Sequence, residues 1–268
     1  MKIRLPFMKK PPRVAVVPLS GMIVAGGRIG SQALNDAGLA PVIEKAFTRG
    51  KPDAVALLLN SPGGSPVQSS LIAARIRRLA AEKNVPVFAF VEDVAASGGY
   101  WLATAADEVF VDTSSIVGSI GVISASFGFH ELMSRHGIER RVHTAGKDKS
   151  ILDPFRPERK EDVKRLTALQ QQIHDSFIAQ VRERRGNRLA GDDDLFTGDI
   201  WVGQAAVDKG LADGIGHLVP VMKSRLGDKV EFRMLGPRRP LLARFGARVL
   251  DDAHAMIEER ALWARYGL

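Results

Sequence analysis

Short apolar runs alternate with longer amphipathic segments along most of this chain. Four runs are dominated by aliphatic and β-branched residues: 14–19, 54–60, 85–91 and 107–111. Continuous apolar runs of this length are typical of strands that are covered on both faces. Two shorter strands are predicted at 122–123 and 140–144.

Apolar residues recur at helical spacing between these runs. The pattern predicts long helices at 66–83 and 157–185, and shorter ones at 100–106, 129–136 and after 199–204. The longest has one apolar stripe, made of Val163, Leu166, Leu169, Ile173, Phe177 and Val181. Alternating strands and helices indicate an α/β layered fold with parallel strands and crossover helices.

Two glycine-rich segments follow predicted strands. Asn60 runs into Ser61-Pro62-Gly63-Gly64, and the strand that ends near Val91 leads into Ala95-Ala96-Ser97-Gly98-Gly99. Sites in parallel α/β sheets lie at the carboxyl ends of the strands. We therefore expect the two segments to meet at one edge of the sheet.

The 268 residues carry a formal net charge of +8 and include no cysteine. Disulfides, thiolate metal sites and cysteine nucleophiles are thereby excluded. Much of the positive charge lies near the ends of the chain, in Lys2, Arg4, Lys9, Lys10, Arg13, Arg233, Arg238, Arg239, Arg244 and Arg248. The simplest interpretation is a solvated surface, and contact with an anionic membrane is the alternative. No nucleic-acid motif accompanies the charge, so nucleic acid is not an expected partner.

No apolar stretch approaches the roughly 20 residues that cross a bilayer, and the first 12 residues do not resemble a secretory signal. A cytoplasmic protein is expected, with peripheral contact at the inner membrane as the alternative. Three parts are predicted: a basic tail at 1–12, one domain at 13–235, and an amphipathic helical tail at 236–268. That last tail is expected to dock on protein, or otherwise on a membrane surface.

Ser97 is the candidate nucleophile. Small residues surround its hydroxyl, and it lies between a predicted strand and a predicted helix. Free N–H groups at a helix start can hold the oxyanion that forms when a serine attacks a carbonyl. An ordinary helix-capping serine is the alternative.

A nucleophilic serine needs a base. His130, His136 and His143 follow Ser97 in the chain, but none lies in a glycine-rich or acidic context that would orient an imidazole. A lysine can serve instead when its environment keeps the amine neutral. Lys147 and Lys149 are the candidates, in a short loop after the segment at 140–144.

Four segments together resemble the bacterial signal peptide peptidase A group, which is peptidase family S49: 59–64, 96–100, 118–122 and 146–154. The resemblance runs from about Val14 to Val219. It implies a crotonase/Clp-protease-like fold. No cofactor is expected, and no metal, because no histidine pair has metal-ligand spacing with a carboxylate partner. The C-terminal segment after about Lys229 is not part of the resemblance, and the N-terminal membrane anchor of many members is not seen here.

The resemblance also implies roles for individual residues. Ser97 matches the nucleophile and Lys149 the general base, with Lys147 as its competitor. Ser119 matches a serine that orients the lysine amine. The oxyanion hole is implied at three glycines, Gly63, Gly64 and Gly98. Members form ring- or dome-like homo-oligomers, in which one subunit can supply the serine and its neighbour the lysine, and they cleave signal-peptide remnants or small unfolded apolar polypeptides.

Three other functions share parts of this pattern. A Clp-type protease would use a Ser-His-Asp triad, but the stretch expected to hold its histidine is Gly121-Val122-Ile123. A crotonase-type acyl-CoA enzyme would need an acidic residue on the helix after Gly64, where none is evident. A scaffold with a dead site is the third, and the intact Ser97, Ser119 and Lys149 argue against it.

Overall fold

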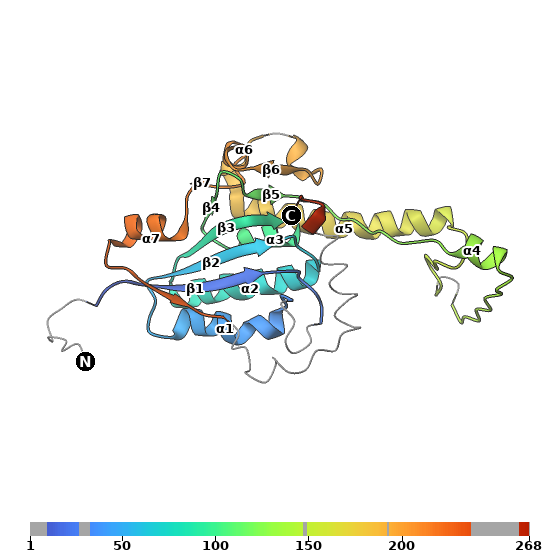
Figure 1. The fold of residues 1–268 in the computed structure, drawn as a ribbon, viewed down its shortest axis with the longest axis horizontal. Helices are drawn as coiled ribbons and strands as arrows, with labels where there is room; N and C mark the ends of the chain where they lie inside the picture. The colour runs from blue at the N-terminus through green and yellow to red at the C-terminus, as the bar shows by residue number, and fades with distance from the viewer. Residues whose placement is uncertain (1–9, 27–32, 147–148, 192, 237–262, 268) are drawn as a thin grey trace. The chain divides into compact units, whose positions relative to one another are not determined.

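The computed structural model describes residues 10–26, 33–146, 149–191, 193–236 and 263–267 (Figure 1). The chain divides into two compact units, Met1–Ile120 with Ile178–Leu268, and Gly121–Phe177. The larger unit contains the sheet and the smaller one is a mostly irregular insertion. Among the described residues, no helix combines the length and the apolar character needed to span a membrane.

An eight-stranded sheet forms the centre of the larger unit, in the order β6-β5-β3-β2-β1-β8, with β4 joining β3 to β7. Its strands are β1 (Arg13–Ser20), β2 (Ala54–Ser61), β3 (Val87–Ala96), β4 (Glu108–Val111), β5 (Ile116–Gly118), β6 (Ile200–Val202), β7 (Gly214–Ile215) and β8 (Glu231–Met234). All pairs are parallel except β5 with β6. The predicted α/β class and the four main predicted strands are therefore confirmed.

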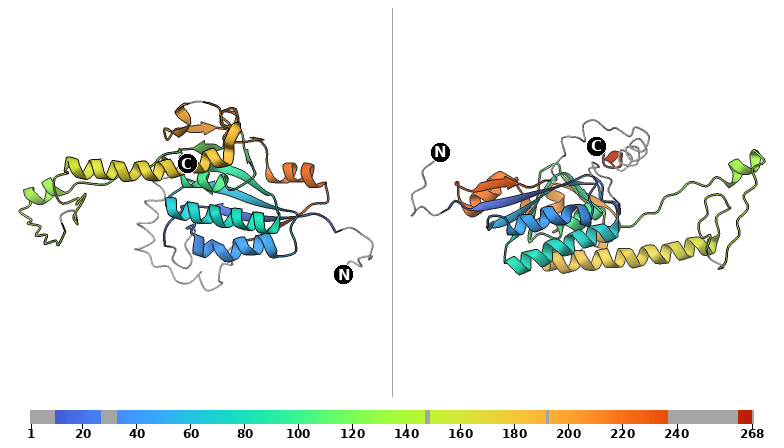
Figure 2. Two further views of the ribbon diagram at one scale, coloured as in Figure 1. Left: turned by 180° about the vertical axis from the view of Figure 1, so that it is seen from behind. Right: turned by 90° about the horizontal axis from the view of Figure 1, so that it is seen from below.

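Helices cover both faces of this sheet. The larger unit contains α1 (Asp36–Thr48), α2 (Pro66–Lys83), α3 (Gly98–Ala103), α6 (Gln204–Asp208), α7 (Leu218–Leu226) and the short 3-10 helices Gly186–Arg188 and Asp193–Phe196. Figure 2 shows α1 and α2 side by side on one face of the sheet. On the other face, Met222 of α7 packs in a cluster with Val14, Ala54 and Phe88.

This two-sided cover explains the continuous apolar runs. Successive side chains of a strand point to opposite faces. Ala54 and Ala56 of β2 belong to the cluster under α7, so Val55 and Leu57 face the side of α1 and α2. All four are at most 1% exposed, which leaves no position on this stretch for a polar side chain.

The smaller unit contains α4 (His130–Arg135) and the first part of α5 (Lys160–Arg185), which continues into the larger unit. Both helices are confirmed. The strands predicted at 122–123 and 140–144 are wrong, because neither segment has a neighbouring strand among the described residues and Ile123 is 68% exposed. The apolar stripe of α5 is buried at Phe177 and exposed at Leu169.

Several helices and strands were not predicted from the sequence. The sequence did not predict helices α1 and α7 or strands β5, β6 and β8. Strands β5 and β6 are only three residues long, and the sequence of β8 includes charged residues. The tail at 1–12 and the helical tail at 236–268 lie almost entirely outside the described residues. The predicted part boundaries therefore stay predictions.

Candidate active site

Ser97 lies in a strained turn between β3 and α3. Its backbone has φ +52° and ψ −122°, a left-handed conformation that costs a non-glycine residue about 1–3 kcal/mol. Two backbone hydrogen bonds maintain it: the Ser97 N–H donates to the Gly118 carbonyl at 2.8 Å, and the Trp101 N–H donates to the Ser97 carbonyl at 3.0 Å. A sharp strand-to-helix turn of this kind can present a serine hydroxyl to a substrate.

The turn after β2 contacts the Ser97 turn directly. Gly63 and Gly64 have φ +101° and +139°. A Cβ built on Gly63 would lie only 2.7 Å from the Gly98 nitrogen and 2.9 Å from the Ser97 Cβ. A Cβ on Gly64 would lie 2.0 Å from the Ile23 carbonyl oxygen, so both positions require glycine. The two glycine-rich segments predicted to meet at one edge of the sheet do meet.

Backbone amides near Ser97 differ in their hydrogen bonding. The Gly63 N–H donates to the Ser61 hydroxyl at 3.2 Å. Within the described ranges, the N–H groups of Gly64 and Gly98 have no acceptor. A Cβ built on Gly98 would lie 3.3 Å from the Gly64 nitrogen, so these two unpaired donors are neighbours. They form a pair that can hold a negatively charged oxygen beside Ser97.

Ser119 lies one residue beyond the carbonyl that holds Ser97. Its φ is +51°, and its N–H donates to the Asp199 carbonyl at 2.6 Å. The preceding Gly118 packs closely on Trp201 of β6. A Cβ built on Gly118 would lie only 2.7 Å from the indole ring. The antiparallel β5–β6 pair thus holds Ser119 in place.

Tyr100 anchors the helix that follows Ser97. Its ring is completely buried, and its hydroxyl donates to the Leu211 carbonyl at 2.9 Å. Burial raises the pKa of Tyr100 well above its usual range, so the hydroxyl keeps its proton and acts as a donor. No pattern around Tyr100 in the sequence signalled this contact over more than 100 residues.

A buried ion pair supports the same region. Asp213 accepts hydrogen bonds from Arg185 at 2.7 Å, from Arg188 at 3.1 Å and from the Val109 N–H at 2.7 Å. The Arg185 side chain is only 2% exposed. Burial alone would raise the pKa of Asp213, but the hydrogen bonds from Arg185 and Val109 and the nearby positive charges lower it below its usual value.

Lys149 belongs to the smaller unit. Its side chain is exposed, and its N–H donates to the Gly146 carbonyl at 3.3 Å. Its competitor Lys147 lies outside the described residues. Because Ser97 and Lys149 belong to different units, their pairing stays a prediction from the sequence.

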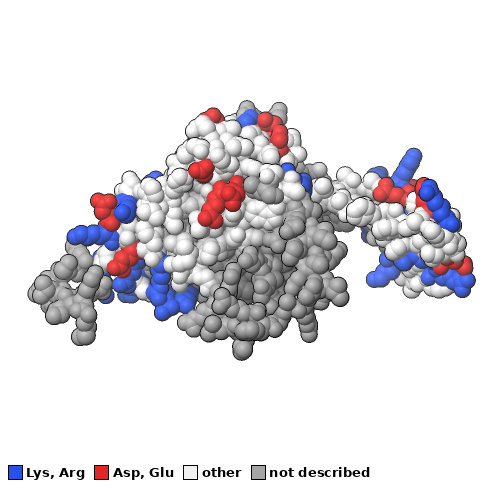
Figure 3. Space-filling view, in the orientation of Figure 1, with Lys and Arg blue, Asp and Glu red and all other residues white. Residues whose placement is uncertain are grey.

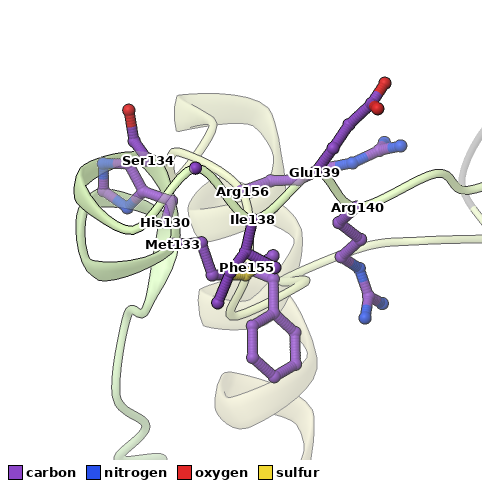
Figure 4. Close-up of a pocket in the computed structure, with 9 residues that line it drawn as sticks. His130, Met133, Ser134, Ile138, Glu139, Arg140, Phe155 and Arg156 are labelled. Atoms are coloured by element: carbon purple, nitrogen blue, oxygen red, sulfur yellow. The ribbon is translucent and has the colours of Figure 1, made fainter.

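Among the residues that the structure describes, the histidines considered as bases have no hydrogen-bonded carboxylate. In the described part of the chain, His130, His136 and His143 make no side-chain hydrogen bond. His130 lines a cavity of about 350 Å³ in the smaller unit, together with Met133, Ile138 and Phe155 (Figure 4). Ser134, Glu139, Arg140 and Arg156 also line this cavity, and Ser97 does not.

His217, unlike these three histidines, has a carboxylate partner, which the sequence did not indicate. It precedes α7, and its Nε2 lies 2.8 Å from Asp112 Oδ2. The pair lines a cavity of about 430 Å³ with apolar walls and the carboxylates of Glu92 and Asp93. Figure 3 shows a few acidic side chains in the middle of an otherwise largely uncharged surface. Ser97 does not line this cavity, and its hydroxyl has no histidine partner among the described residues.

Residues 80–229 match the model for peptidase family S49, which is more than half of the chain. The chain belongs to peptidase family S49. This confirms the family that the motifs had indicated.

Two curated relatives are longer than the part that this chain matches. A Brucella melitensis protein named as a Na⁺/H⁺ antiporter is 49% identical over 271 residues, which is 95% of this chain and 37% of that protein. A putative protease from Methanocaldococcus jannaschii is 36% identical over 162 residues, 60% of this chain and 51% of that protein. The chain therefore spans between a third and about half of these relatives.

One solved structure has the same fold. A mutant of a membrane-bound stomatin-specific protease aligns with a TM-score of 0.50 and 15% identity, covering 85% of this chain and 100% of that one. This likeness confirms the α/β layered architecture expected for S49 and shows the fold alone.

Proposed function

We propose that this S49 domain hydrolyses peptide bonds through an acyl-enzyme on Ser97. The Ser97 Oγ attacks the carbonyl carbon, and the resulting oxyanion accepts hydrogen bonds from the Gly64 and Gly98 N–H groups. Each such donor contributes about 2.7–4 kcal/mol of transition-state stabilisation. The observation that carries the proposal is a serine with φ +52° beside two amides that have no acceptor among the described residues.

Lys149 is proposed as the general base and Ser119 as the residue that orients its amine. The neutral amine takes the Ser97 proton and passes it to the leaving nitrogen as the C–N bond breaks. It then removes a proton from the water that attacks the acyl ester and returns it to Ser97. The support for Lys149 is its place in the segment 146–154.

The proposed substrates are small or unfolded apolar polypeptides, including signal-peptide remnants, and the proposed assembly is a ring- or dome-like homo-oligomer. Exposed apolar side chains in the smaller unit support the assembly: Ile123, Phe127, Phe129, Leu132, Ile138, Phe155, Val163, Leu169 and Ile173. Phe127 is 81% exposed. Exposed apolar side chains gathered in one unit support a surface that a neighbouring subunit would cover.

We also propose that the peptidase works at a membrane surface. The basic residues near both ends of the chain provide the charge, and the relative from Brucella melitensis is named as a Na⁺/H⁺ antiporter. Binding to anionic phospholipid vesicles is expected in a co-sedimentation assay, and it should fall steeply with salt. A chain truncated after Gly236 should bind more weakly. Equal binding to neutral vesicles would contradict the electrostatic part of this proposal.

The Ser97→Ala variant tests the activity. Casein or apolar-peptide hydrolysis is expected to disappear in this variant and to persist in Ser114→Ala, which alters an exposed serine. A serine-directed fluorophosphonate should label the wild type and Ser114→Ala but not Ser97→Ala. Absence of hydrolysis and labelling in the wild type would contradict the proposal, and turnover of coenzyme A thioesters would then favour crotonase chemistry.

A further inference from the structure

Ser61 is a buried polar side chain beside the turn that bears the proposed oxyanion donor. It is the last residue of β2, and it is 0% exposed. Its hydroxyl donates to the Gly21 carbonyl at 2.7 Å and accepts from the Gly63 N–H at 3.2 Å. The hydroxyl therefore links two backbone segments that are about 40 residues apart.

These bonds determine which amide of the turn remains unpaired. Ile23 pairs with the same turn, since its N–H donates to the Gly63 carbonyl at 2.8 Å and its carbonyl accepts from the Ser65 N–H at 2.7 Å. With the Gly63 N–H bonded to Ser61, the Gly64 N–H is the one left without an acceptor among the described residues.

Ser61 also contacts the start of α3. A Cβ built on Gly99 would lie 2.4 Å from the Ser61 carbonyl oxygen and 3.2 Å from its Cβ. The residue thus lies between the two turns that supply the proposed donors, Gly64 and Gly98. A shift of Ser61 would change the spacing between these donors.

We infer that Ser61 is a positioning residue that makes Gly64, and not Gly63, the oxyanion donor of this turn. This inference rests on the proposed peptidase activity of Ser97. Ser61 does not touch the reacting atoms in this scheme. It acts by binding the Gly63 N–H and by holding the turn against the Gly21 carbonyl.

The Ser61→Ala variant of the full chain tests this role. Loss of a whole oxyanion donor lowers kcat by about 10²–10³-fold, so a displaced donor should lower kcat roughly 10–100-fold with KM nearly unchanged. The affinity for a peptide aldehyde should fall by a similar factor, because its adduct with Ser97 carries the same oxyanion.

Ser115→Ala is the matched control. Ser115 is 1% exposed, and its hydroxyl also links backbone groups: it lies 2.5 Å from the Glu92 carbonyl and 3.1 Å from the Val91 carbonyl, and it accepts from the Asp112 N–H at 2.9 Å. Both variants should lose similar stability, but only Ser61→Ala should lose aldehyde affinity. Amide hydrogen exchange at Gly63 should also accelerate in Ser61→Ala alone, and this measurement does not depend on activity.

The possible results separate this inference from the proposed function. If Ser61→Ala matches Ser115→Ala in kcat, aldehyde affinity and Gly63 exchange, the positioning role is overturned while the activity of Ser97 stands. If the wild type shows no Ser97-dependent hydrolysis, the proposed function fails and the inference fails with it. If Ser61→Ala does not fold, Ser61→Thr replaces it in the test. Because Ser61→Thr keeps a hydroxyl, its kcat should lie within a few fold of the wild-type value. A folded Ser61→Thr that binds the Gly63 N–H yet has a low kcat would also overturn the inference.

Discussion

Replacing Lys149 with alanine is expected to lower kcat for peptide hydrolysis by about 10³–10⁶-fold, because Ser97 would lose the base that accepts its proton. Lys147→Ala is the matched control and should retain kcat within a few fold. Steady-state hydrolysis of an apolar peptide by the purified variants measures both. Full activity in Lys149→Ala, with loss in His130→Ala or His143→Ala, would show that a histidine is the base.

A mixture of two inactive variants tells which subunit supplies the lysine. If Lys149 acts on the Ser97 of a neighbouring subunit, subunits of Ser97→Ala and Lys149→Ala that exchange should regain a substantial part of the wild-type rate. If both residues act within one chain, the mixture stays inactive. Size measurement of the mixed sample must show that the subunits have co-assembled.

Replacing Asp213 with alanine is expected to lower the free energy of unfolding by about 3–5 kcal/mol at neutral pH. The change leaves the Arg185 guanidinium, with a side chain that is 2% exposed, without its carboxylate. Denaturant unfolding measures the loss. Asp194→Ala is the control, because Asp194 pairs with Lys209 at a surface site where its own side chain is 50% exposed. An exposed pair contributes about 0–1 kcal/mol.

The loss in Asp213→Ala should depend on pH. The pKa of Asp213 lies below its ordinary value of 3.8 in the folded protein, so its ionised form stabilises the fold above that value. The stabilisation is lost as the pH falls through the lowered pKa. The difference between wild type and Asp213→Ala should therefore be largest near neutral pH and shrink below about pH 4. A difference that stays constant into strong acid would contradict this account of the ion pair.

Prediction from the sequence succeeded where local periodicity matched burial. The runs at 14–19 and 54–60 became β1 and β2, and helix α2 has the predicted bounds, Pro66–Lys83. It failed for 122–123 and 140–144, where apolar or β-branched residues lie in a unit whose described residues include no strand. Strand formation depends on a neighbouring strand, which a local pattern does not reveal.

The candidate site was also predicted only in part from the sequence. Glycine-rich segments after two strands were sufficient to predict that the Gly63-Gly64 turn and the Ser97 turn would meet, because parallel strands end at one edge. Which amide is free, how Ser61 is bonded and why Tyr100 is anchored depend on side chains that meet across long separations. No spacing rule encodes those contacts.

The four main strands, the long helices, the family and the candidate nucleophile could be derived from the linear pattern of residues, because periodicity and short motifs act over a few neighbouring positions. The folded chain alone shows the positive φ of Ser97, the Arg185–Asp213 pair and the Gly64 and Gly98 amides that lack an acceptor in the described ranges. Each of these features depends on groups brought together from distant segments, and it is the packing of the sheet and its helices that supplies the partners.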